Sequence, residues 1–187
     1  MADYKYMRAL PKRDLRAFSK AEMDAVLTYD PETGVFRWLQ AIMCARGIRP
    51  PLSEAGSPND SGYTLIKLYG RLYRAHHLAW LTMTGDWPPR EGDIDHEDRC
   101  RSNNAWSNLR AATRGQNNVN AKIRKSNKSG YKGVSWRAEI NRWHARITVG
   151  GKILLLGNFE RIEDAAEARK IAELAHYPTF TTHKAPK

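Results

Sequence analysis

The sequence predicts an α+β protein made of short antiparallel hairpins and a few helices, organised as two small units in tandem. Two observations predict the strands: runs of alternating apolar and polar residues recur in pairs, and turn-forming residues separate the members of each pair. A third observation predicts the tandem order, because a basic stretch without apolar periodicity lies at residues 122–130. With 187 residues, of which 41% are hydrophobic, the chain can bury a core in each unit.

The first half of the chain carries signals for two hairpins and two helices. Ser19 and Glu22 match a capping box, so a short helix is expected there. The run TYDPETGVFRWL predicts a hairpin, and GYTLIKLYGRLYRA predicts another around Gly70. HHLAWLTMTG continues as a helix that ends at Gly85. Residues 40–61 are rich in Gly, Pro, Ser and Asn, and we interpret them as loop.

The middle segment, IDHEDRCRSNNAWSNLRAATRGQNN, predicts a further hairpin followed by a helix. IDH matches the end of a strand, and LRAAT matches the strand that returns after a loop. Thr113 and Gln116 form a second capping-box pattern, so a helix should begin at Arg114. Asn117 then falls in the first turn and can face back over the hairpin. Asn118 points elsewhere, because it lies about 100° further round the helix.

Beyond the basic stretch, three strand-like runs and a helix predict a compact βββα unit. The strands are YKGVSW, RWHARITV and KILLLGNF, with turns at Asn141 and at residues 150–151. A helix follows until Pro178, and its alanine-rich face is expected to pack on the sheet with Leu154 to Leu156 as core partners. The helical spacing comes from five apolar residues: Ile162, Ala165, Ala166, Ile171 and Leu174.

The positive charge of the chain is confined to one third of its length. Residues 99–159 contain 13 Lys and Arg and a single acid, Glu139, which is a balance of +12 against +11 for the whole chain. A surface that only keeps a protein soluble usually mixes signs, so this segment indicates a polyanionic partner. The basic residues alternate with aromatics in strand-like runs and not along an amphipathic helix, which favours nucleic acid over a membrane surface.

The sequence lacks the features of a membrane span, a secretion signal and a thiolate zinc site. No apolar run approaches the roughly 18 residues of a membrane span, and MADYKYMRALPKRD has no apolar signal core. Cys44 and Cys100 form no CxxC pair, so we expect free, buried thiols in a reducing cytosol and no structural zinc. No feature indicates an obligate protein partner.

The middle segment also holds the groups that phosphodiester hydrolysis needs. The reaction requires a base that activates water and a cation that neutralises the phosphate. A neutral histidine with a pKa near ~6.5 can serve as the base, and Mg²⁺ prefers carboxylate and amide oxygens. Asp95, His96 and one asparagine supply this set, although each alone is more often a turn, cap or packing residue.

These residues resemble the HNH nucleases of bacteriophages, which include homing endonucleases and share the ββα-metal (His-Me finger) fold. The resemblance rests on D-H, N-N-x-x-x-N-L-R and T-x-x-x-N at matching intervals in the middle segment, preceded by GYTLIKLYGRLYRAHHLAW. It implies that His96 is the general base and that Asn108 orients His96 and ties the loop. It also implies that Asp95 and Asn117 bind one Mg²⁺ or Mn²⁺ per active site. His76 could contact a phosphate, as could His77, or pack at the helix start.

The C-terminal run resembles the Apetala-type domain of plant ethylene-response factors, which is also found attached to phage HNH nucleases. Y-x-G-V, R-W-x-A-x-I and L-G-x-F carry the match over about fifty residues. The resemblance implies that Lys132, Arg137, Trp143 and Arg146 face DNA, although Trp143 could equally be core. Lys132 replaces the usual arginine, which exchanges a bidentate contact for a point charge. Further basic residues expected at the DNA are Arg110, Lys122, Arg124 and Arg142.

The sequence therefore predicts a site-selecting, metal-dependent endonuclease that hydrolyses duplex DNA in the cytoplasm of a bacterial host cell. The expected order is an N-terminal extension at 1–60, a nuclease domain at 61–121, a basic linker at 122–130 and a DNA-binding domain at 131–182. An alternative is a DNA-binding regulator whose HNH unit is a non-catalytic scaffold. A weaker alternative is an RNA-processing enzyme.

Overall fold

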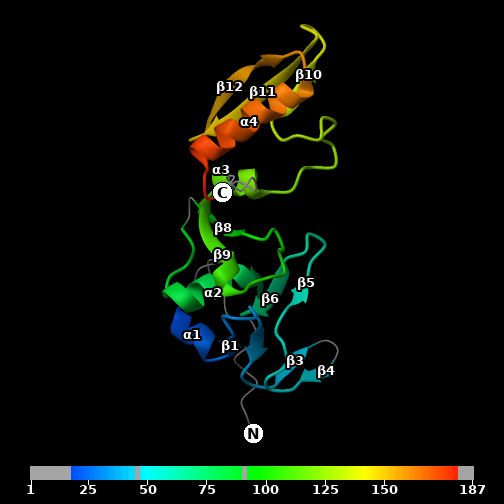
Figure 1. Ribbon diagram of the computed structural model, residues 1–187. Helices are drawn as coiled ribbons and strands as arrows, with labels where there is room; N and C mark the ends of the chain where they lie inside the picture. Colours follow the sequence, from blue (N-terminus) through cyan, green and yellow to red (C-terminus); the bar gives the residue numbers. More distant parts are fainter. Residues whose placement is uncertain (1–17, 45–46, 90–91, 181–187) are drawn as a thin grey trace. The chain divides into compact units, whose positions relative to one another are not determined.

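The computed structural model describes residues 18–44, 47–89 and 92–180, as a mixed α+β chain of small antiparallel sheets and a few helices (Figure 1). The chain divides into two compact units, residues 1–111 and 112–187, each with its own hydrophobic cluster. The boundary falls inside a strand of the predicted nuclease domain. Within the described ranges, no helix has the length and apolar character needed to cross a bilayer.

The first unit opens with the predicted capped helix and hairpin. Helix α1 (Lys20–Asp24) has both halves of the Ser19–Glu22 capping box, so its first N–H groups are satisfied locally. Strands β1 (Leu27–Tyr29) and β2 (Phe36–Trp38) pair antiparallel, and their buried side chains join the core of this unit.

The interpretation of residues 40–61 as loop is wrong in part. Strands β3 (Ile42–Cys44) and β4 (Gly47–Arg49) pair with each other, and β5 (Ser57–Pro58) pairs with the edge of the next hairpin. Met43 and Ile48 face each other in this pairing and are 68% and 63% exposed, so no buried face marks these strands in the sequence.

The second predicted hairpin and its helix form the centre of the first unit. Strands β6 (Thr64–Leu68) and β7 (Arg71–Arg74) turn at Tyr69 and Gly70, both with positive φ, as a two-residue hairpin turn requires. Helix α2 (Ala75–Thr84) follows at once and ends at Gly85, whose φ of 84° supplies the left-handed cap. Ile66, Leu68, Leu78 and Leu81 are fully buried where the hairpin and the helix meet.

The third hairpin consists of β8 (Gly92–His96) and β9 (Leu109–Thr113), which pair with each other, as predicted. The loop between them contains a 3₁₀ turn, η2 (Trp106–Asn108), whose tryptophan packs on the core together with Trp80 and Trp87. Because β8 carries Ile94 into the core, its neighbours Asp95 and His96 are held in fixed positions.

The second unit begins with helix α3 (Arg114–Asn120), which starts at the predicted residue and has both halves of the Thr113–Gln116 capping box. The predicted three-stranded sheet follows in the order β10 (Val134–Arg137), β11 (Arg142–Val149) and β12 (Lys152–Phe159). Helix α4 (Ile162–His176) covers one face of this sheet with Ala165 and Ala172, so the alanine-rich contact is confirmed (Figure 1).

Two predicted core partners of α4 are wrong. Leu154 and Leu155 are 40% and 59% exposed. The register shifts at Ala145 and Arg146, which leaves Leu156 as an extra residue in β12 and breaks the simple alternation. Leu156 alone of the three leucines packs against the buried clusters.

Candidate active site

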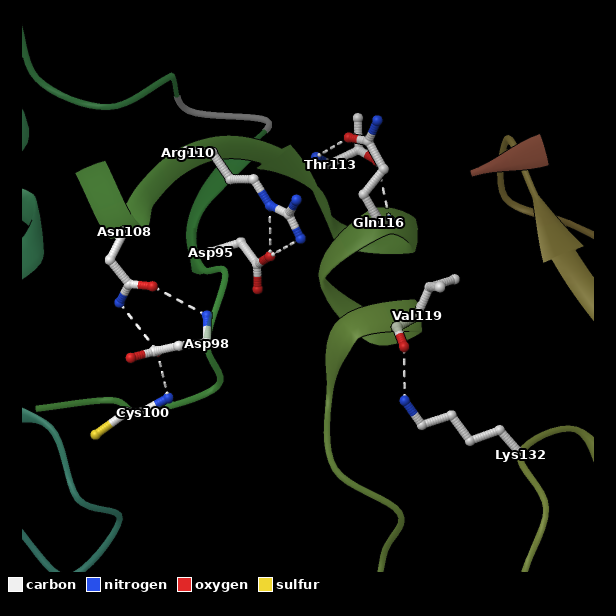
Figure 2. Close-up of polar contacts among 9 residues, drawn as sticks. All are labelled: Asp95, Asp98, Cys100, Asn108, Arg110, Thr113, Gln116, Val119 and Lys132. Carbon is white, nitrogen blue, oxygen red and sulfur yellow. Dashed lines mark hydrogen bonds and ion pairs between the residues drawn. The ribbon is translucent and has the colours of Figure 1, made fainter. Parts of the chain in front are cut away.

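The predicted metal ligand Asp95 lies in β8 and is buried, 4% exposed. Arg110 from the facing strand β9 donates to its Oδ2 through Nε at 3.0 Å and approaches it with Nη2 at 2.9 Å (Figure 2). Two nitrogens of a planar guanidinium fix the orientation of the carboxylate. Arg110, which we expected at the DNA, is therefore bound to Asp95 within the hairpin.

The predicted base His96 follows Asp95 and is buried as well, 5% exposed. Its Nε2 lies 3.4 Å from Oδ1 of Asn104, in the loop between β8 and β9. Its ring meets that of His76 edge-on, with 4.8 Å between the ring centres. Burial lowers the pKa of His96 below the ordinary value of 6.5, so the imidazole is neutral at physiological pH and can accept a proton.

Asn108 ties the loop, as its resemblance to the middle residue of the HNH motif implies. Its Oδ1 accepts from the backbone N–H of Asp98, and its Nδ2 donates to the Asp98 carboxylate (Figure 2). Nδ2 also donates to the carbonyl of Asn103. Nε2 of His96 contacts Asn104, whereas the Asn108 side chain contacts Asp98 and Asn103. That Asn108 orients His96 stays a prediction.

The loop also holds the one cysteine whose side chain the structure describes. Cys100 is free, as expected, but it is exposed, so the expectation of a buried thiol is wrong for this residue. Its backbone N–H donates to the Asp98 carboxylate that Asn108 also contacts (Figure 2). Cys100 therefore occupies a loop position that the backbone defines, and its sulfur is not part of the core.

The fourth motif residue, Asn117, lies in α3 and is half-buried. The Thr113–Gln116 box fixes where α3 begins, and so fixes the position of Asn117 on the helix (Figure 2). Helix α3 is described with the second unit, whereas Asp95 and His96 belong to the first. That Asn117 and Asp95 grip one ion stays a prediction.

A cluster of positive charge lies beside His96 in the first unit. The guanidinium groups of Arg74 and Arg101 each lie 4.8 Å from the centre of the Tyr63 ring, which is 6.1 Å from the ring of His96. Both arginines are exposed, and their cation–π contacts hold them over the same ring. Positive charge on a ring that neighbours the His96 ring suits an incoming phosphate.

The neighbouring histidines have different surroundings. His76 is 1% exposed, and burial, together with the charges of His77 and His96, lowers its pKa to about 2. A buried ring does not reach a phosphate directly, so the packing alternative for His76 agrees with its position. His77 is partly exposed and lies 3.4 Å from the Asp93 carboxylate.

The predicted DNA-binding residues of the second unit fall into two places. Ala145 and Ile147 of β11 are buried under α4, so Arg142, His144 and Arg146 point to the opposite, open face of the sheet. Arg137 pairs with Arg142 and shares that face. Trp143 lies on the covered side, where it packs against the buried side chains of Val134, Ala145 and Ala165. This position favours its alternative role as a core residue.

The remaining basic residues surround a cavity of about 470 Å³ beside the second half of β11. Lys122, Arg124 and Lys132 line it, together with Arg169 of α4 and the β11 segment 146–148. Lys132 is already engaged there, because its Nζ donates to the carbonyl of Val119 in the last turn of α3 (Figure 2). A lysine at this end of a helix satisfies a terminal carbonyl and complements the helix dipole.

Comparison with known proteins agrees with this hairpin, loop and helix. The profile of a family described as HNH endonuclease matches residues 73–119, which include all four predicted catalytic and metal-binding residues. The chain is 39% identical over 89 residues to Protein 3.8 of Escherichia phage T7, a match that covers 46% of this chain and 73% of that protein. This chain belongs to the HNH endonuclease family. No solved structure matches it significantly.

Two features of the candidate site could not be predicted from the sequence of this HNH endonuclease. No pattern in the sequence links Asn104 to the base, yet its Oδ1 lies 3.4 Å from Nε2 of His96. The pair of arginines on Tyr63 was also missed, because Arg74 and Arg101 lie 27 residues apart and only the fold brings them to one ring. Membership of the family implies DNA as the substrate and a dependence on metal.

Proposed function

We propose that this protein is a metal-dependent endonuclease that hydrolyses phosphodiester bonds in duplex DNA. The observation that carries the proposal is the Asp95–His96 pair: a fixed carboxylate next to a buried imidazole that burial keeps neutral. A neutral imidazole can take the proton from the attacking water at physiological pH. The loop that Asn108 ties, through Asp98 and Asn103, holds the asparagine that contacts this base.

Asp95 and Asn117 would hold the metal ion. The donor set fits a hard cation, because a carboxylate and an amide oxygen are the ligands that Mg²⁺ and Mn²⁺ accept while they keep several waters. When bound, the ion supplies charge neutralisation at the phosphate and stabilises the leaving oxygen. It would share the Asp95 carboxylate with Arg110, whose Nε and Nη2 both contact Oδ2.

The exposed arginines near His96 would contribute to the reaction by positioning the phosphate. Arg74 and Arg101 would bind the phosphate next to the scissile bond, and Tyr63 holds both guanidinium groups in place. Arginine presents two N–H groups to a phosphate, so a preorganised pair positions the backbone without reading its sequence.

We further propose that residues 131–182 form an Apetala-type DNA-binding domain, joined by the basic linker 122–130 to a nuclease domain of the ββα-metal type at 61–121. The open face of the sheet, with Arg137, Arg142 and Arg146, suits entry into a major groove, where arginines bind guanine edges. Such a domain would select the site at which the nuclease cuts, as in a phage homing endonuclease.

The test is cleavage of plasmid and phage DNA by the full-length protein with Mg²⁺, and separately with Mn²⁺. We expect nicked or linear product that EDTA abolishes. His96→Ala should retain binding in a gel shift and lose at least about 100-fold in cleavage rate, the lower range for removal of a general base. His176→Ala, at an exposed histidine that ends α4, is the matched control and should cleave. Normal cleavage by His96→Ala would refute the assignment of the base.

One observation favours a second function, a DNA-binding regulator with a non-catalytic HNH unit. Arg110 already neutralises the Asp95 carboxylate, which lowers the attraction of that group for a cation. In this case the gel shift persists while no metal produces cleavage on any substrate. The same plasmid assay therefore separates the two functions.

A further inference from the structure

Three potential metal ligands lie together in the first unit, outside the residues assigned to the catalytic ion. His76 and His77 open helix α2, and Asp93 lies in strand β8. One ligand atom from each side chain lies within 4.8 Å of the others. The three residues are separate from Asp95, which faces Arg110.

The burial of His76 is the first indication of a ligand. Its side chain is 1% exposed, and neither ring nitrogen has a hydrogen-bond partner among the described residues. An imidazole nitrogen that is buried without a partner is unfavourable, because it has lost its hydrogen bonds to water. Tyr63, His77 and His96 surround the ring with their own rings, so they pack against it without satisfying its nitrogens. A metal ion bound to one nitrogen would remove part of this cost.

The spacing of the other two ligands is the second indication. Nε2 of His77 lies 3.4 Å from Oδ1 of Asp93, which is longer than the best hydrogen bonds between such groups. Two ligands of a tetrahedral zinc ion, each about 2.0–2.1 Å from the metal, lie about 3.3 Å apart. His77 and Asp93 are 31% and 40% exposed at their side chains, so an ion can reach them from solvent and keep a water as a further ligand.

We propose that His76, His77 and Asp93 bind a first-row divalent transition-metal ion such as Zn²⁺, beside the active site and distinct from the catalytic cation. Two imidazoles and one carboxylate suit such an ion and do not suit Mg²⁺, which requires oxygen ligands. The absence of a CxxC pair, from which we expected no structural zinc, does not bear on a site without thiolates. The bound ion would fix the His76 ring that contacts His96, and it would join α2 to β8. The inference does not depend on cleavage of DNA.

The test uses Co²⁺ as a spectroscopic probe of the full-length protein after dialysis against EDTA. We expect about one equivalent to bind with the strong visible absorption of a four- or five-coordinate ion. His77→Ala and Asp93→Ala should each weaken binding by more than about 100-fold, beyond the effect of losing an outer-shell partner. Asp95→Asn, which removes the predicted catalytic ligand, and His144→Ala should leave the absorption unchanged.

A thermal melt provides a second readout that does not depend on colour. Zn²⁺ should raise the melting temperature of the wild-type protein and of Asp95→Asn, and should not raise that of His77→Ala. The partial exposure of His77 and Asp93 means that both alanine variants should fold, which circular dichroism can verify. Retention of the absorption in His77→Ala, its loss in Asp95→Asn, or a wild-type spectrum of weakly absorbing six-coordinate cobalt would each overturn the proposal.

Discussion

At the scale of single residues, the site depends on histidines that the fold keeps neutral. His96 and His76 both have a lowered pKa, and burial is the largest cause for each. For His96 this suits the proposed role of a base, because a protonated imidazole cannot accept a proton from water. For His76 the same effect makes the folded protein sensitive to acid.

We expect the stability of the metal-free protein to fall as the pH is lowered below 6.5. The pKa of His76 is about 2 in the folded chain, so at pH 5 the unfolded chain binds a proton that the folded chain does not. Protons therefore favour unfolding, and this one residue should cost about 2 kcal/mol between pH 7.5 and pH 5. Urea titrations in EDTA at several pH values measure the slope. His76→Phe should reduce the slope, and an equal slope in that variant would contradict the assignment.

Asn108 gives a second prediction at this scale. Its side chain satisfies the N–H of Asp98 and the carbonyl of Asn103, so Asn108→Ala leaves polar groups of the loop without partners. We expect a loss of about 1–3 kcal/mol in the free energy of unfolding, measured by urea denaturation, together with slower cleavage. Ser107→Ala, one residue away and exposed, is the control and should change stability by less than about 0.5 kcal/mol. Equal stability of the two variants would show that the loop does not depend on Asn108.

At the scale of elements, local chemistry was predictable and long-range environment was not. Both capping boxes, the turn at Gly70 and the cap at Gly85 follow from neighbours in the sequence, and the structure has each of them. The β3–β4 hairpin was missed because its paired residues Met43 and Ile48 both face solvent and leave no alternating pattern. The exposure of Leu155 was missed because it depends on a bulge, and a bulge depends on the partner strand.

In the candidate site, too, the local motif could be predicted from the sequence and the long-range contacts could not. The intervals between Asp95, His96 and Asn108 could be taken from the sequence, because the motif lies within one hairpin. The surroundings of the base could not: Asn104 and His76 meet His96 only after the loop and α2 have folded against β8. Burial, and therefore the lowered pKa of His96, is a property of that packing.

Gly133 directly precedes strand β10 and lies against the backbone of strand β11. Its φ is +67°, and a Cβ there would lie 2.3 Å from the carbonyl oxygen of Arg146, a backbone atom that cannot move aside. Gly130 has a φ of +77° but open space around it. Gly133→Ala and Gly130→Ala share the cost of the left-handed backbone, so the difference between them isolates the clash. We expect Gly133→Ala to be less stable than Gly130→Ala by about 1–3 kcal/mol in thermal melts, and equal melting temperatures would contradict the packing of Gly133 on β11.

At the scale of the whole molecule, the uneven distribution of charge is the feature that bears on function. The segment 99–159 holds the excess positive charge, and it supplies both the open face of the sheet and most of the lining of the basic cavity. Binding to DNA should therefore depend steeply on salt. If six to ten phosphates are contacted, affinity should fall roughly 10³–10⁵-fold between 50 and 200 mM salt.

Residues that line the basic cavity allow the predicted salt dependence of DNA binding to be tested with specific variants. Lys122 and Arg124 are exposed and line it, so the double variant Lys122→Gln/Arg124→Gln removes two charges without disturbing a buried group. If each contacts a phosphate, the slope of log affinity against log salt should become shallower by about 1.8, since each phosphate contributes about 0.9. The control is Arg161→Gln/Lys170→Gln, which removes the same charge from residues already paired with Glu163 and Glu167. Its slope should match that of the wild-type protein. Equal slopes for the two double variants would mean that the effect is one of net charge alone, and that the DNA does not pass along the cavity.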